Sequence, residues 1–192
     1  MLDPAPVLYL DLVDPGSYVM KRRAELILES HGYDLDLAAF EVRPPGEPPI
    51  DAAEPGWVEY CNHIAPMLRE LGLDPATPTR VPRTRKAHEL VALAREQGCE
   101  TDALEALFRA FIEGDVDLAR VDRLVPLARQ WQLDTTLAKA TLDVDRFTAD
   151  IDARRSEALA RGVRGVPTLW FDDRILEGIH SPDAIDAFVR NV

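Results

Sequence analysis

Residues 162–171 place the tightest limits on what this chain can fold into. Gly162 follows a run rich in Ala, Glu and Arg and is typical of the end of a helix. The apolar residues 169–171 and the two aspartates after them predict a strand, a tight turn and a second strand. Pro167 stands at the entrance to the first strand, where it cannot donate a ladder hydrogen bond. A cis Val166–Pro167 bond would turn the neighbouring backbone groups toward a ligand, and a trans proline beginning an edge strand is the alternative.

The opening of the chain predicts a strand that runs directly into a helix. Residues 7–13 form a short, mostly apolar run typical of a buried strand. Apolar residues then recur at helical spacing until Gly32. Asp14 as the N-cap and Pro15 at the first helical position suit this helix start. Residues 35–42 predict a second strand, which a right-handed crossover would place parallel to the first.

A proline-rich connector over residues 44–55 predicts a stiff linker that leaves the sheet. After it, helical patterns separated by glycines predict four or five helices, over residues 57–71, 84–97, 101–112 with Thr101 as cap, 118–130 and 135–142. A long helix over residues 143–161 then returns to the sheet, and Ser181 begins the last helix.

Two stretches carry a resemblance to a known family. Gly165-Val166-Pro167-Thr168, with the hairpin and Ser181-Pro182-Asp183 after it, resembles the C-terminal half of the thioredoxin-fold DsbA family. The similarity is greatest to the branch of FrnE-like oxidoreductases, kappa-class glutathione transferases and hydroxychromene-carboxylate isomerases. The resemblance implies an α/β thioredoxin-like fold with an inserted all-helical domain. Residues 1–50 and 143–192 would form the thioredoxin-like domain and residues 51–142 the insertion, and Pro167 would be cis.

The family keeps its chemistry at the first strand–helix junction. FrnE-like members have Cys-Pro-Trp-Cys-Tyr there, whereas this chain has Asp14-Pro15-Gly16-Ser17-Tyr18. The glutathione-using branch has Ser-Pro-Tyr-Ser, of which only the second serine is matched, by Ser17. A carboxylate at Asp14 cannot form a disulfide, and it would repel an incoming thiolate by about 1 kcal/mol at about 4 Å in water. Dithiol–disulfide exchange through this motif is therefore excluded. Asp14 is either a plain helix cap, or a general base or the binder of a cationic ligand.

The resemblance and the junction together define the candidate site. Asp14 and Ser17 are the catalytic candidates. The residues that would bind substrate are Pro15, Tyr18, Val166, Pro167, Thr168, His180, Ser181 and Asp183. A helix cap explains Ser181 and Asp183 equally well. Cys61 and His63 are two positions apart on a helix and point in different directions, so no metal site is expected.

Composition limits the partners. A net charge of −12 and a pI near 4.7 argue against nucleic acid and anionic membranes, and no apolar run has the length of a transmembrane helix. The first residues lack the basic flank of a signal peptide. Cys61 and Cys99 form no disulfide framework and fit a cytoplasmic protein. We expect a small-molecule or peptide ligand in the cleft. The sequence does not decide between a monomer and a homodimer.

Three functional interpretations follow. The first is an isomerase- or transferase-type enzyme that acts on a small thiol conjugate or an aromatic acid. The second is a redox-inactive module that binds a peptide or partner by backbone pairing beside Pro167. The third, an oxidoreductase working through Cys61 or Cys99, is the least favoured because neither cysteine lies in the motif. No cofactor is certain; glutathione or another low-molecular-weight thiol is the candidate.

Overall fold

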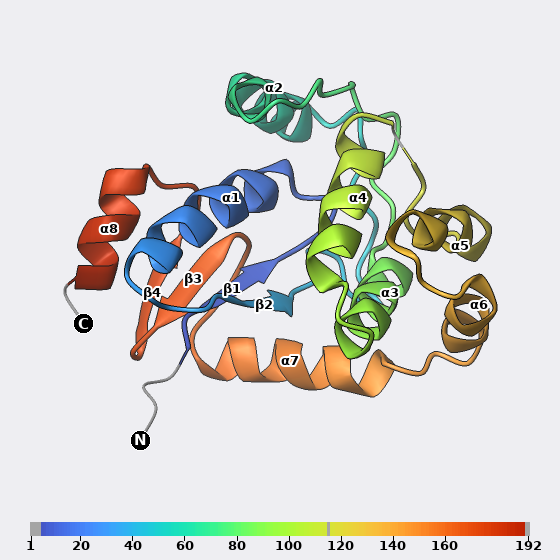
Figure 1. Ribbon diagram of the computed structural model, residues 1–192. Helices are drawn as coiled ribbons and strands as arrows, with labels where there is room; N and C mark the ends of the chain where they lie inside the picture. Colours follow the sequence, from blue (N-terminus) through green and yellow to red (C-terminus); the bar gives the residue numbers. More distant parts are fainter. Residues whose placement is uncertain (1–4, 115, 191–192) are drawn as a thin grey trace.

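The structure is a computed structural model that describes residues 5–114 and 116–190 (Figure 1). Its sheet has the strand order β2-β1-β3-β4. The strands are β1 (Val7–Leu10), β2 (Asp36–Ala39), β3 (Thr168–Phe171) and β4 (Arg174–Glu177). β1 pairs in parallel with β2 and antiparallel with β3, and β3 pairs antiparallel with β4. The thioredoxin-like sheet and its parallel opening pair are confirmed.

Helices cover both faces of this sheet. α1 (Pro15–Ser30) and α8 (Pro182–Arg190) lie on one side, and α7 (Thr148–Ala160) lies on the other (Figure 1). Alternation along β1 separates the two packing layers. Leu8 and Leu10 belong to the main core with α1 and α8, whereas Val7 and Tyr9 belong to a smaller cluster with Ala158 of α7. The two central strands, β1 and β3, are thereby buried on both faces, whereas the outer strands β2 and β4 are partly exposed.

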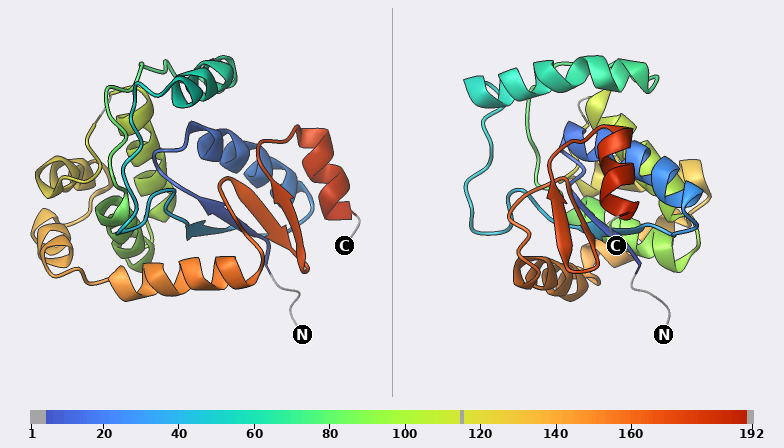
Figure 2. Two further views of the ribbon diagram at one scale, coloured as in Figure 1. Left: turned by 180° about the vertical axis from the view of Figure 1, so that it is seen from behind. Right: turned by 90° about the vertical axis from the view of Figure 1, so that its left-hand side faces the viewer.

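The expected helical insertion is present between β2 and α7. It contains α2 (Pro55–Glu70), α3 (Arg85–Glu96), α4 (Glu100–Ile112), α5 (Val121–Ala128), the 3-10 turn η1 (Arg129–Trp131) and α6 (Thr135–Asp143). α2 lies apart from the other insertion helices, at the end of the molecule opposite α7 (Figure 2). Irregular segments over residues 40–54 and 71–84 connect it to the rest of the chain. None of the helices described is long and apolar enough to cross a membrane.

Several predicted boundaries were wrong, each for a local reason. α4 begins at Glu100 with Cys99 as its N-cap, not Thr101, which places Glu100 and Asp102 in the first turn near the positive end of the helix dipole. α7 begins at Thr148 rather than at residue 143, because Asp145 adopts a φ of 54° that a helix cannot contain.

The hairpin turn and the first strand also follow from local chemistry. Asp172 and Asp173 both have positive φ, 49° and 56°, as the predicted tight turn requires. β1 ends at Leu10 rather than at residue 13, because the Asp14 N–H donates to the Asp11 carbonyl and closes a turn before α1. The division of the chain at residues 51 and 142 stays a prediction.

Candidate functional site

The β1–α1 junction is built around the side chain of Asp14. This residue is the N-cap of α1, and Pro15 follows at the first helical position. Asp14 Oδ2 accepts hydrogen bonds from the Ser17 N–H at 2.7 Å and from Ser17 Oγ at 2.5 Å. Only 5% of Asp14 and none of Ser17 is exposed. The predicted cap is confirmed, and its carboxyl is buried.

A residue of the insertion completes this site. The Tyr60 hydroxyl, on α2, donates to Asp14 Oδ1 at 2.5 Å. Gly16 makes this approach possible, because a Cβ there would lie 2.2 Å from Tyr60 Oη and 2.8 Å from Ile179 Cδ1. Nothing in the sequence marked Tyr60 as a site residue, because it lies 46 positions from Asp14. The sequence pattern of its helix does not show which way that helix faces relative to α1.

Burial controls the electrostatics of the pair. It raises the pKa of the Asp14 carboxyl from its ordinary value of 3.8 to about 6, although hydrogen bonds from Ser17 and Tyr60 act in the opposite direction. Burial and the charge of Asp14 together raise the pKa of the Tyr60 hydroxyl, so this hydroxyl stays protonated and donates. Asp14 can therefore both release and accept a proton close to neutral pH.

Neither cysteine has the lowered pKa of a reactive thiol. Cys61 and Cys99 are both free and half-buried. Burial and the nearby Asp14 raise the pKa of Cys61 to about 11, and burial raises the pKa of Cys99. A reactive cysteine needs a lowered pKa. Across the described ranges, no three His, Cys, Asp or Glu side chains are arranged to hold a metal ion.

The proline segment has the expected peptide geometry. The Val166–Pro167 bond is cis. The Pro167 carbonyl accepts from the Gly178 N–H at 2.8 Å, and Thr168 Oγ1 donates to the Gly165 carbonyl at 2.8 Å. The segment after β4 thus bonds to Pro167 and then reaches α1, where Ile179 packs beside Gly16 and the His180 carbonyl accepts from Arg23 at 2.9 Å. It thereby connects the Pro167 segment to α1.

The remaining predicted residues do not contact Asp14 directly. The Tyr18 hydroxyl is buried and donates to Glu105 of α4 at 3.0 Å. His180 Nε2 lies 2.8 Å from the carbonyl of Glu177. Ser181 Oγ accepts from a backbone N–H of α8 at 3.3 Å, and Asp183 is exposed in the first turn of that helix. Tyr18 therefore attaches the insertion to α1, and Ser181 acts as a helix cap.

A small cavity of about 110 Å³ adjoins the junction. Pro15 forms one wall, and Trp57 and Cys61 of α2 form another, together with the segment around residues 75–78. The indole Nε1 of Trp57 is buried and donates to none of the described residues. Apolar side chains make up most of the lining, and Asn62, Arg69 and Thr77 add polar groups.

Known proteins resemble this chain over almost its full length. The uncharacterised protein YwbO from Bacillus subtilis is 26% identical, with 95% of this chain and 94% of YwbO covered. A probable DsbA oxidoreductase from Streptomyces coelicolor superposes with a TM-score of 0.85 at 23% identity, covering 97% of this chain and 88% of that one. A 2-hydroxychromene-2-carboxylate isomerase superposes with a TM-score of 0.77 at 15% identity, covering 98% of this chain and 94% of the isomerase.

The cytosolic disulfide reductase DsbM from Pseudomonas aeruginosa, solved with GSH, gives a TM-score of 0.68 at 18% identity and covers 98% of each chain. At such identities these structures establish the fold alone. The model of the DSBA-like thioredoxin domain matches residues 7–190. With the cis proline, the four-stranded sheet and the helical insertion in place, this chain belongs to the DSBA-like thioredoxin domain family.

Proposed function

We propose that this protein is a redox-inactive, isomerase- or transferase-type enzyme that acts on a small thiol conjugate or an aromatic acid. One observation carries the proposal: the buried Asp14 carboxyl is held by hydrogen bonds between Tyr60 and Ser17. Burial raises the pKa of this carboxyl to about 6. A general acid–base group works best when its pKa lies near the working pH. Residues 14–17 would occupy the place of the family's dithiol motif, with acid–base chemistry in place of thiol chemistry.

Each residue at the junction has a distinct part in this proposal. Asp14 would take up and return the proton of the substrate. Ser17 has no exposed surface and acts through Asp14, whose Oδ2 it orients with two hydrogen bonds. The Tyr60 hydroxyl occupies Oδ1, so a substrate group would displace it to reach that oxygen. The small cavity beside Pro15 and Trp57 would receive the apolar part of the substrate.

One structural neighbour supports a thiol-containing ligand, because the DsbM structure contains GSH. Another neighbour, a 2-hydroxychromene-2-carboxylate isomerase, supports the alternative of an aromatic acid. In this chain, the half-buried backbone at Val166 beside cis-Pro167 offers pairing groups to a glutathione-like peptide. We therefore propose glutathione, or another low-molecular-weight thiol, as the ligand, and the residues around Pro167 as the surface that holds it.

Asp14→Asn tests the proposal, with Asp134→Asn as the matched control. Both residues are aspartate N-caps, and Asp134 caps the exposed start of α6, far along the chain from the junction. Wild type and control should bind glutathione in calorimetry and isomerise 2-hydroxychromene-2-carboxylate. Asp14→Asn should keep glutathione binding and lose at least about 100-fold in turnover, the lower end of a general acid–base contribution. Turnover equal to that of the control would show that Asp14 is only a helix cap.

A redox-inactive binding module is the second candidate, and the cis bond between Val166 and Pro167 favours it because extended ligands pair with backbone groups of this kind. The same calorimetry separates the two. A module would bind extended peptides and leave glutathione unbound, and its affinity would not change in Asp14→Asn.

A further inference from the structure

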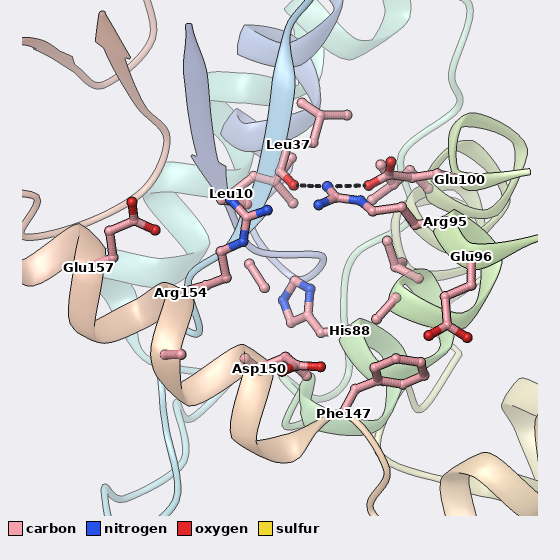
Figure 3. A pocket seen from close by; sticks show the side chains of 17 residues that line it. Leu10, Leu37, His88, Arg95, Glu96, Glu100, Phe147, Asp150, Arg154 and Glu157 are labelled. Carbon is pink, nitrogen blue, oxygen red and sulfur yellow. Dashed lines mark hydrogen bonds and ion pairs between the residues drawn. The ribbon is translucent and has the colours of Figure 1, made fainter. Parts of the chain in front are cut away.

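A second cavity, of about 440 Å³, has a different set of lining residues from the Asp14 site (Figure 3). β1 and β2 contribute one wall, α3 and the start of α4 a second, and α7 a third. Asp14, Ser17, Tyr60 and Pro167 are not among its lining residues. Most of the lining is aliphatic or aromatic, including Leu37, Val91, Phe147 and Ile151. A cavity of this size, lined mainly by apolar side chains with polar groups among them, is typical of a small-molecule site.

Among the described residues, His88 is the one buried polar residue in this lining. The His88 side chain is 2% exposed and extends from α3 toward the middle of the cavity (Figure 3). Its Nε2 lies 3.1 Å from Asp11 Oδ1, while Asp11 Oδ2 accepts from the Val42 N–H at 2.7 Å. Within the described ranges, His88 Nδ1 makes no hydrogen bond.

The bond to Asp11 determines the chemistry that His88 offers. A carboxylate only accepts, so neutral His88 carries its proton on Nε2. Nδ1 is then a lone-pair acceptor. Because Nδ1 has no partner among the described residues, a ligand that donates a hydrogen bond can use it, and a ligand without a donor cannot.

Charge compensation restricts the ligand further. Asp36 pairs with Arg154 at 2.8 Å and with Arg95 at 3.2 Å, and Arg95 also pairs with Glu100 at 2.7 Å. The acids Glu96 and Glu157 pair with Arg146 and Arg161 respectively. Asp150, which is exposed, is the one charged lining residue for which the described chain provides no ion pair. An anionic ligand would have to compete for an arginine that is already paired, and a cationic ligand could pair only with the exposed Asp150, where solvent leaves an ion pair little net value. The lining therefore favours an uncharged molecule.

We propose that this cavity is a second ligand site, separate from the Asp14 site, and that it binds an uncharged mono- or bicyclic aromatic molecule carrying an O–H or N–H donor. Phenols and indoles belong to this class. The ring packs between the apolar side chains of β2, α3 and α7, and the donor bonds to His88 Nδ1. This site does not depend on the reaction proposed for Asp14.

Phenol and indole are the probes, and titration of an ¹⁵N-labelled full chain is the measurement. Both should bind saturably and shift the amide resonances of Leu37, Val91 and Ile151. Toluene, which lacks a donor, should bind at least tenfold more weakly than phenol. Benzoate and benzylamine, which are charged, should also bind at least tenfold more weakly. Equal binding of toluene, or tighter binding of either ion, would overturn the proposal.

Filling the cavity provides a structural test. Ala92 of α3 lines the cavity and is half-buried, whereas Ala160 of α7 is exposed and lies outside the lining. Ala92→Phe should weaken phenol binding at least tenfold, and the matched control Ala160→Phe should leave it unchanged. If Ala92→Phe does not fold, Ala153→Phe, at an exposed lining position, replaces it. Phenol binding of wild-type strength in a folded cavity variant would refute the site.

Discussion

The raised pKa of Asp14 makes the stability of the fold depend on pH, and Asp14→Asn isolates this dependence. The carboxyl has a pKa of about 6 in the folded chain and an ordinary value of 3.8 when unfolded. Between these values the folded chain holds a proton that the unfolded chain has released. The stabilisation is therefore fully present below about pH 3.8 and is lost as the pH rises through about 6.

The magnitude follows from the two pKa values. The difference between 3.8 and about 6 corresponds to about 3 kcal/mol, at 1.36 kcal/mol per pKa unit. Most of this change falls between about pH 4 and pH 7. Asp14 is buried, so solvent screens little of it. Set against a typical unfolding free energy of about 5–15 kcal/mol, an effect of this size is readily measurable.

Urea unfolding at a series of pH values measures the effect. Asparagine has no charge at any pH, and its side-chain oxygen can still accept from the Ser17 N–H that Asp14 binds. The unfolding free energy of wild type minus that of Asp14→Asn should fall by about 2–3 kcal/mol from pH 4 to pH 7.5. The same difference for the exposed cap variant Asp134→Asn should stay nearly flat. A constant difference for Asp14→Asn would refute the reasoning about its burial.

Three further predictions use the same molecule. Wild type should show no insulin reduction above background, and any activity that survives replacement of Cys61 and Cys99 by serine would contradict the thiol argument, because the chain has no other cysteine. Gly16→Ala should destabilise the fold by about 1–3 kcal/mol, since its Cβ would lie 2.2 Å from Tyr60 Oη, and a double-mutant cycle with Tyr60→Phe should recover part of the loss. Tyr18→Phe removes the bond to the α4 carboxylate and should lower the unfolding free energy by about 1 kcal/mol in denaturant titrations, whereas unchanged stability would show that the bond contributes nothing.

Much of the fold is predictable because its signals are local. Asp14 before Pro15 indicates a helix start from adjacent residues alone, and the structure has that cap. Asp172 and Asp173 indicate the hairpin in the same way, because both tolerate positive φ. The start of α7 was misplaced because Asp145 has a positive φ, which depends on how the turn before the helix packs. The spacing of apolar residues along the sequence carries no information about that packing.

The site was less predictable, because its contacts join distant parts of the chain. The Tyr60–Asp14 bond depends on where irregular segments place α2, and no sequence pattern determines this. The His88–Asp11 pair joins α3 to the end of β1 across 77 positions. A buried Asp beside a buried His becomes visible as a pair only when the tertiary fold is known.

Asp14, Gly16 and Tyr60 form one structural unit at the start of α1. The carboxyl of Asp14 takes up the Ser17 N–H that would otherwise stabilise a thiolate at this helix end. The missing side chain of Gly16 leaves room for the Tyr60 hydroxyl, and that hydroxyl satisfies the second oxygen of the buried carboxyl. A larger residue at position 16 would remove Tyr60 and leave a buried carboxylate oxygen unpaired, which is strongly unfavourable. The buried carboxyl at the start of α1 is therefore satisfied in part by α2, through a contact that requires glycine at position 16.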